Sequence, residues 1–88
     1  MIYVDPLCRH GWVIFGKTVQ SCHMWTDGDI EELHQMADKI GLSRRYFQNK
    51  KLLKHYDLTE RRRKEAIKNG AIELNRRESV ESWQKLRS

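Results

Sequence analysis

The sequence predicts an α+β fold in which two main helices pack on a small mixed sheet. Three features of the 88 residues predict it. Residues 12–25 are rich in β-forming side chains on both sides of a Gly-Lys pair, and residues 26–41 repeat apolar side chains every three or four positions. Residues 57–74 run from a charged helical pattern through Asn-Gly into a short apolar stretch. We therefore expect one compact domain over residues 1–75 and a polar tail over residues 76–88 with a weak helical pattern.

The first predicted elements are strands. Residues 2–5 alternate apolar and polar side chains until Pro6 ends the pattern. A hairpin follows, because Gly16-Lys17 suits a two-residue turn between residues 12–15 and 18–25. With this loop, the predicted cross-strand pairs are Phe15 with Thr18, Ile14 with Val19, Trp12 with Ser21 and His10 with His23.

Residues 26–41 contain the clearest helix. Its apolar stripe has the spacing of one helix face and consists of Ile30, Leu33, Ala37 and Ile40. Thr26 or Asp27 would cap its start, and Gly41 would end it. We expect the stripe to pack on a sheet face that includes Val4, Val13 or Ile14, and Ile72.

The second half of the chain is more polar. Residues 42–58 indicate a short helical turn around 44–47, followed by a loop or strand. A second helix begins at Asp57 or Thr59 and ends at Gly70, and residues 71–74 form a short strand. In the tail, apolar side chains recur every three residues at Val80, Trp83 and Leu86, which indicates a last helix.

Composition limits the cellular setting. No apolar run approaches the about 20 residues of a transmembrane helix, and residues 1–10 lack the pattern of a signal peptide. The two cysteines, Cys8 and Cys22, are too few to staple a secreted domain. Adjacent Cys22 and His23 would point to opposite faces of a strand, which argues against a zinc site that uses both. These features predict a soluble cytoplasmic protein with no membrane contact.

Positive charge is concentrated in the middle of the chain. The net charge is +5, but residues 41–70 carry ten cations and only three acids. This asymmetry is typical of a surface that meets phosphate or an acidic protein, although exposed Lys and Arg also serve solubility alone. The candidate phosphate- or nucleic-acid-binding residues are Arg44, Arg45, Arg61, Arg62, Arg63 and Lys64.

A second candidate site consists of polar side chains from four predicted elements. They are Asp5, His23, His34, His55 and Asp57, which could converge at one end of the sheet. Imidazole and carboxylate groups suit a divalent metal, with Asp5, His23 and His55 as its ligands. They equally suit general acid–base catalysis, since histidine exchanges protons near neutral pH. The corresponding hypothesis is a metal- or histidine-dependent phosphodiesterase.

Each of these residues also has a structural alternative. His23 can be a hydrogen-bonded strand residue, and His34 can bridge a helix and solvent. Asp57 can be the N-cap of the second helix, with Glu60 three residues later completing a capping box. For the segment as a whole, we expect "HYD" (55–57) to face inward and "RRRK" (61–64) to face outward.

The ordered segments "YVDP", "HGW", "QSCHMW", "EELH", "YFQ", "HYDLTERRRK" and "NGAIEL" resemble a family of small bacterial and phage proteins catalogued only as a domain of unknown function. The resemblance covers roughly residues 2–74, whereas the tail from Asn75 and the insert "NKKLLK" look particular to this sequence. It implies a single compact intracellular domain, often phage-borne, with no established reaction. The positions that match its recurrent polar pattern are Asp5, His23, His34, Gln48, His55, Tyr56 and Asp57.

Three classes of function follow. The preferred one is binding of nucleic acid or a phosphate-bearing ligand, because Tyr46, Phe47 and Tyr56 are interleaved with the cations. The second is the phosphodiesterase or a related hydrolase, with a divalent metal as its cofactor. The third is a protein that binds and modulates a host protein, in line with small size and the phage association of the resembled family.

Overall fold

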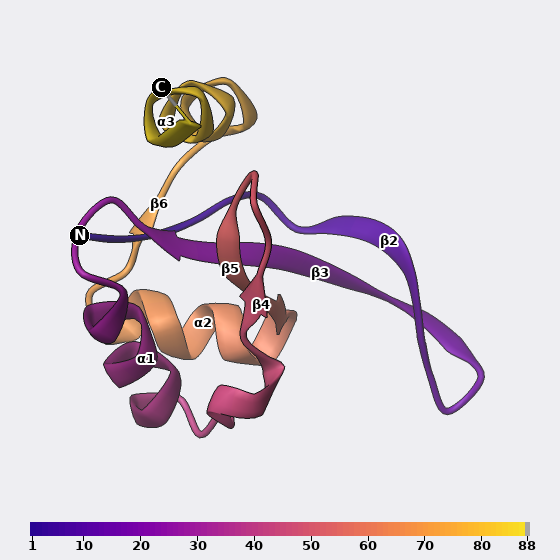
Figure 1. Cartoon of the computed structure of the whole chain (residues 1–88). Coiled ribbons are helices and arrows are strands. Elements are labelled where there is room, and N and C mark those ends of the chain that lie inside the picture. The colour runs from indigo at the N-terminus through magenta and orange to yellow at the C-terminus, as the bar shows by residue number, and fades with distance from the viewer. Residues whose placement is uncertain (88) are drawn as a thin grey trace.

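The computed structural model describes residues 1–9 and 13–87, and its chain forms both strands and helices (Figure 1). In chain order they are β1 (Ile2–Val4), β2 (Cys8–Ile14), β3 (Lys17–Thr26), α1 (Ile30–Lys39), the 3-10 helix η1 (Arg44–Tyr46), β4 (Gln48–Asn49), β5 (Lys54–Thr59), α2 (Glu60–Lys68), β6 (Ile72–Glu73) and α3 (Arg76–Arg87). This order confirms the predicted α+β class and the sequence of its main elements.

β3 is the central strand of one mixed sheet. The strand order is β4-β5-β3-β1-β6, and β2 pairs with the first half of β3. β5 lies antiparallel along one edge of β3, where His23 pairs with Asp57. β1 lies antiparallel along the other edge, where Val4 pairs with Met24. Because β6 runs parallel to β1, the sheet is mixed, as predicted.

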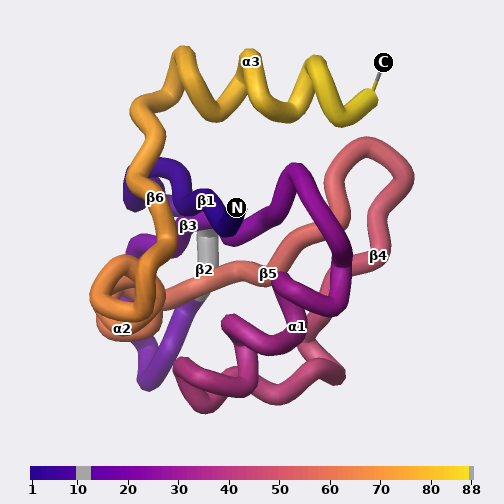
Figure 2. Tube along the Cα trace, turned by 90° about the vertical axis from the view of Figure 1, so that its left-hand side faces the viewer, coloured from indigo at the N-terminus to yellow at the C-terminus, as the bar shows by residue number. Residues whose placement is uncertain are grey.

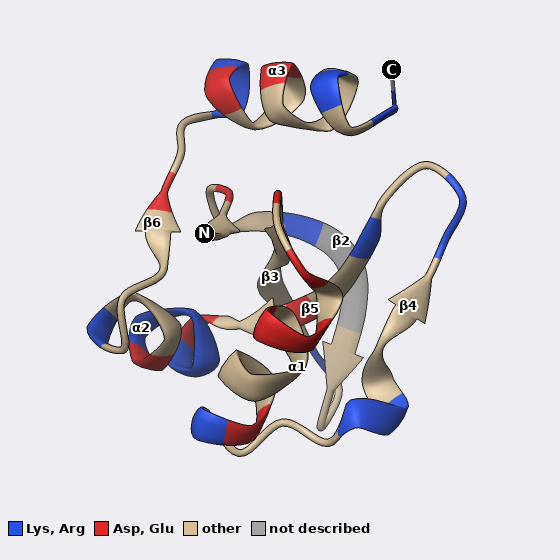
Figure 3. Cartoon of the chain, turned by 60° about the vertical axis from the view of Figure 1, so that its left-hand side comes forward, with Lys and Arg blue, Asp and Glu red and all other residues tan. Residues whose placement is uncertain are grey.

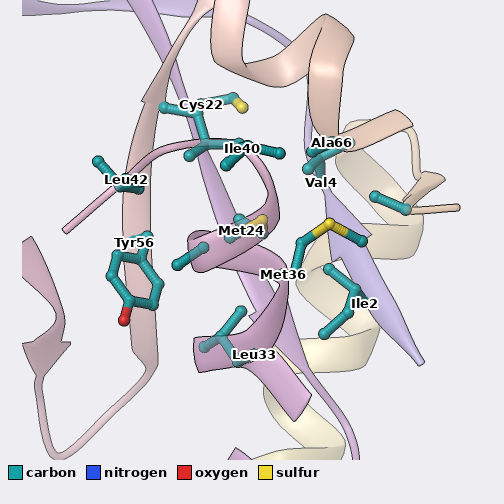
Figure 4. Packing of buried hydrophobic residues seen from close by; sticks show 13 residues of the cluster. Ile2, Val4, Cys22, Met24, Leu33, Met36, Ile40, Leu42, Tyr56 and Ala66 are labelled. Carbon is teal, nitrogen blue, oxygen red and sulfur yellow. The ribbon is translucent and has the colours of Figure 1, made fainter. Parts of the chain in front are cut away.

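Side-chain alternation divides the sheet into two faces, and helices cover both (Figure 2). α1 and α2 lie on one face and α3 runs across the other (Figure 1). The face toward α1 and α2 supplies the strand part of the hydrophobic core, namely Ile2, Val4, Cys22, Met24, Tyr56 and Leu58 (Figure 4). The alternate residues of the same strands point to the opposite face, toward α3. They are Tyr3 of β1, His23 and Trp25 of β3, and His55 and Asp57 of β5, with Asp5 one residue beyond β1.

α1 packs as its apolar stripe predicts. Leu33 and Ala37 are fully buried in the core, and the helix ends before Gly41, whose φ of 73° is left-handed. Its N-cap is Asp29 rather than Thr26 or Asp27, because the Asp29 carboxylate accepts from the amide of Glu31.

The sheet surface beneath α1 differs from the prediction. Val13 is exposed and Ile14 is half-buried, because the β2–β3 hairpin projects beyond the helices (Figure 1). Ile72 is also only half-buried. Of the predicted sheet residues, Val4 does belong to the core cluster that buries the stripe, together with Met24, Tyr56 and Leu58 from the middle of the sheet.

The hairpin turn lies one residue earlier than predicted. Ile14 pairs with Lys17, so the loop residues are Phe15 and Gly16, with φ of 51° and 76°. Two consecutive left-handed residues form the hairpin turn that matches strand twist, and this turn overrides the Gly-Lys pattern. The predicted pairs of Phe15 with Thr18 and of Ile14 with Val19 are therefore wrong, because Thr18 pairs with Val13 and Ile14 pairs with Lys17. The predicted pairs of Trp12 and His10 lie outside the described residues.

The remaining helices have identifiable caps or contacts. The Thr59 hydroxyl caps α2 by accepting from the amide of Arg62, so Asp57 belongs to β5 and is not the cap. The tail forms α3, and Ser79 on this helix is buried. None of the helices in the described part of the chain has the length and apolar character needed to cross a bilayer.

The two cysteines are free thiols in different surroundings. Cys22 is fully buried in the core, and burial raises the pKa of its thiol to about 12. Its neighbour His23 points to the opposite face of β3, as the alternation predicts.

Candidate functional site

Asp5 and His23 form the first part of a polar cluster on the α3 face of the sheet. Asp5 follows β1, and its Oδ2 lies 2.9 Å from Nδ1 of His23. Its Oδ1 accepts a second hydrogen bond of 2.6 Å from the backbone amide of the same residue. Asp5 is buried and its carboxylate can only accept, so Nδ1 of His23 carries the proton and the lone pair of the neutral ring lies on Nε2.

His55 and Asp57 form the second part, on β5. Nδ1 of His55 donates to the carbonyl of Leu53 at 2.9 Å, which again puts the lone pair on Nε2. That Nε2 lies 3.5 Å from Oδ1 of Asp57, and the amide of Gln48 on β4 donates to Oδ2 of the same carboxylate. The rings of His23 and His55 are 5.0 Å apart, so the two parts meet.

The structure excludes His34 from this cluster. Tyr56 lies between His55 and Asp57 in β5 and therefore points to the core face. His34 contacts that face from α1, where its Nδ1 is 2.6 Å from the Tyr56 hydroxyl and its ring packs against Phe47. The predicted convergence of His34 with the other four residues is therefore not found, because α1 lies on the core face of the sheet and the cluster lies on the opposite face.

Three of the clustered residues have the geometry of metal ligands. One ligand atom each from His23, His55 and Asp57 lies within 4.8 Å of the other two. Two ligands of a tetrahedral Zn²⁺ at about 2.05 Å are separated by about 3.3 Å, close to the distance between His55 and Asp57. Asp5 is not in this ligand set; it hydrogen-bonds the far nitrogen of His23, as outer-sphere carboxylates do. The ligand prediction of Asp5, His23 and His55 therefore changes to His23, His55 and Asp57.

The electrostatics of the cluster follow from these hydrogen bonds. The bond to Asp5 raises the pKa of His23, against the opposing effect of burial. When the His55 imidazole carries a proton on Nε2 as well as on Nδ1, its hydrogen bond to Asp57 lowers the pKa of that carboxyl, and the hydrogen bond from Gln48 lowers it further. Asp57 is therefore held as a carboxylate, which is the form that binds a cation.

Both imidazoles line a cleft of about 530 Å³ between α3 and the loop that joins β4 to β5. The loop and the helix supply the rest of its lining, namely Lys50, Lys51, Leu52, Leu53, Trp83 and Arg87. The Trp83 ring lies edge-on to His23, with the ring centres 5.7 Å apart. Asp57 faces a neighbouring pocket that Gln48 also lines. The two imidazoles of the cluster are therefore reached from the surface through a cationic opening.

The model of a family described as protein of unknown function (DUF4031) matches residues 2–86. The chain belongs to this family. The match confirms the resemblance in the sequence and extends it through residues 75–86, which include most of α3. Neither the curated proteins nor the solved structures give a significant match to the chain.

In this DUF4031 chain, most of the cations expected to bind phosphate have partners within the fold. Arg44 pairs with Glu31 and Asp38, and Arg45 lies over the ring of Tyr46. Three more are engaged around α2: Arg62 donates to the carbonyl of Ile40, Arg63 to that of Asp5, and Lys64 pairs with Glu60.

Arg63 does not face solvent, because its guanidinium hydrogen-bonds to the backbone of Asp5 in the polar cluster. Its guanidinium also pairs with Glu73, and its side chain is 15% exposed. By contrast, Arg61 is exposed on α2. The prediction that "RRRK" faces outward therefore holds for Arg61 and Lys64 but not for Arg62 and Arg63, which are half-buried and donate to backbone carbonyls.

The cations that line the cleft of this DUF4031 chain were missed in the sequence. Figure 3 shows Lys and Arg on the β4–β5 loop below the cationic end of α3. Lys50 and Lys51 belong to the segment that looks like an insert, and Arg87 belongs to the tail. In the sequence, Lys50 and Lys51 lie a few residues before His55, but Arg87 is far from it. Arg87 lines the same cleft only because α3 crosses this face of the sheet.

Proposed function

We propose that this protein is a metal-dependent hydrolase that cleaves phosphate esters. The observation that carries the proposal is the set of His23, His55 and Asp57, each oriented by a further hydrogen bond, at an accessible cleft. Structural zinc sites use four protein ligands and are closed, whereas catalytic sites use three and keep a position for water. Two imidazoles and one carboxylate are a common catalytic set.

The nature of the ligands favours particular metals. Imidazole nitrogen suits Zn²⁺, Mn²⁺, Fe²⁺ or Ni²⁺ better than Mg²⁺, which prefers oxygen ligands and keeps its water. Lys50, Lys51 and Arg87 at the same cleft favour an anionic substrate over a peptide. A phosphate diester meets both requirements, because its oxygens can contact a metal and cations together.

The reaction requires only water as the second reactant. A metal held by His23, His55 and Asp57 would lower the pKa of a bound water to near 7, and that water would supply the nucleophile for phosphorus as the bond to the leaving oxygen breaks. The proton released by the water ends on the leaving oxygen. One diester and one water therefore give one phosphate monoester and one alcohol.

Calorimetric titration and a chromogenic diester test the proposal. We expect the wild type to bind one equivalent of Zn²⁺ or Mn²⁺ and to hydrolyse bis(p-nitrophenyl) phosphate with that metal. Loss of a partner that merely orients a ligand costs about 10–100-fold in affinity, so His55→Ala and Asp57→Asn should cost at least as much. His34→Ala is the matched control, because His34 lies on the other face of the sheet. No metal uptake by the wild type, or equal loss in the control, would rule the proposal out.

A second candidate uses the histidines without a metal. Two imidazoles 5.0 Å apart, one of them paired with Asp5, are also the elements of general acid–base cleavage. The two candidates differ in their response to a chelator. Diester hydrolysis that persists after exhaustive treatment with EDTA, yet is lost in His23→Ala, would favour the metal-free reaction.

A further inference from the structure

We infer that the cleft beside the polar cluster binds a single strand of nucleic acid, whose phosphates contact Lys50, Lys51 and Arg87. The inference rests on the proposed function, because it names the substrate class of the same site. It also differs from the surface predicted from the sequence, since none of these three cations was among the predicted binding residues.

The first argument is the availability of charge. Lys50, Lys51 and Arg87 are exposed, and none of them forms an ion pair within the part of the chain that the structure describes. The Arg87 guanidinium makes one weak contact, 3.4 Å from Nε to the carbonyl of Trp83. By contrast, Arg44, Arg62 and Arg63 already have acceptors in the fold. The three cations at the cleft are therefore available to contact the phosphates of a polyanion.

The second argument is the position of this charge. Lys50 and Lys51 belong to the β4–β5 loop and Arg87 belongs to the end of α3, so cations stand on both walls of the cleft. No carboxylate belongs to the described lining of this cleft. A strand of phosphates that runs between the walls would pass directly over the imidazoles of His23 and His55, where the proposed metal binds.

The third argument is the shape and character of the lining. Leu52, Leu53 and Trp83 give the cleft apolar surface on which bases can pack, and single-strand-binding proteins combine such surface with a cationic groove. The indole Nε1 of Trp83 is buried and has no hydrogen-bond acceptor among the described residues. A duplex is read instead by a helix or strand that projects into a groove, which a concave site cannot do.

Fluorescence anisotropy with a labelled oligothymidylate of about 8 nucleotides tests the inference. The cleft variant combines Lys50→Gln, Lys51→Gln and Arg87→Gln. The control combines Lys39→Gln, Arg61→Gln and Lys68→Gln, which remove equal charge from exposed positions of α1 and α2 on the other face. A milder variant with only Lys50→Gln and Lys51→Gln covers the case that the triple variant does not fold.

We expect the cleft variant to bind about 10–100-fold more weakly and its salt dependence to flatten by about 2 log units per log unit of salt, since each phosphate contact to a single strand contributes about 0.7. The control should keep wild-type affinity. An RNA oligonucleotide of the same length should behave like the DNA strand, and a matched duplex should bind more weakly.

Equal binding by the cleft variant and the wild type would overturn the inference. So would tighter binding of the duplex, or full displacement of the oligonucleotide by thymidine monophosphate at equal concentration, because either result removes the need for a strand. The proposed function has a separate readout. If the calorimetric titration shows no metal binding while cleft-dependent oligonucleotide binding persists, the hydrolase proposal fails and the binding site stands.

Discussion

Asp5 fixes the chemical state of His23, and this role can be tested apart from its contribution to folding. The carboxylate accepts from Nδ1 and thereby presents Nε2 to the cluster. In Asp5→Asn the side-chain amide can donate to Nδ1 instead, which moves the ring proton to Nε2. We expect Zn²⁺ affinity to fall by about 10–100-fold, as for other outer-sphere partners. Nitrogen-15 NMR of His23 should show the exchanged tautomer, a change that a purely structural role would not cause.

The same substitution has a predicted pH dependence. Asp5 raises the pKa of His23 above its ordinary value of 6.5, so the pair stabilises the fold below that pH and the contribution is lost as pH rises through the folded-state pKa. The free energy of unfolding of the wild type should therefore exceed that of Asp5→Asn most clearly on the acidic side of neutrality. A difference that grows with increasing pH would contradict the assigned hydrogen bond.

For single residues, the sequence could identify the polar side chains that are candidates for a site, but not which of them lie on the same face of the sheet. Asp5, His23, His55 and Asp57 are among the residues predicted to converge, and these four do lie next to one another on one face of the sheet. His34 was grouped with them because it lies at the edge of an apolar stripe. Which face of the sheet that stripe covers depends on the long-range pairing of β3 with β5, and no local pattern in α1 encodes it.

Among the elements, the hairpin carries a conformational cost that a single substitution should remove. Phe15 is fully exposed and has a φ of 51°, in the left-handed region that is costly for most side chains. Asn tolerates this region and precedes Gly in the preferred two-residue turn. We expect Phe15→Asn to raise the free energy of unfolding by about 0.5–1 kcal/mol in urea denaturation. A loss of stability would show that the Phe15 ring makes contacts that offset its strained backbone.

The elements also differ in how far sequence could predict them. α1 could be predicted because its apolar residues recur at the spacing of one helix face. Leu33 and Ala37 of that face are indeed buried. The turn was misplaced because Gly16-Lys17 is a good local pattern, while the register is decided by which two residues accept left-handed φ. The strand at Lys54–Thr59 was left open between loop and strand, since its pairing partner lies more than 30 residues away in β3.

At the scale of the whole molecule, α3 completes a second layer that the sequence did not reveal. The tail has few apolar residues, so its pattern indicated an appendage rather than part of a core. Its contacts come from polar and aromatic groups instead. Ser82 accepts from the indole of the buried Trp25, and Trp83 packs against that indole with the ring centres 5.4 Å apart.

This arrangement predicts that α3 stabilises the fold through Trp83. Truncation of a buried Trp costs about 3–5 kcal/mol, and Trp83 is half-buried, so Trp83→Ala should cost about 2 kcal/mol by urea denaturation. Leu86→Ala is the matched control, because Leu86 belongs to the same helix and is 42% exposed; it should cost little. His23, His55 and Asp57 come from β3 and β5, so Trp83→Ala should still bind Zn²⁺. If Trp83→Ala and Leu86→Ala have equal and small effects, α3 does not form a stabilising layer.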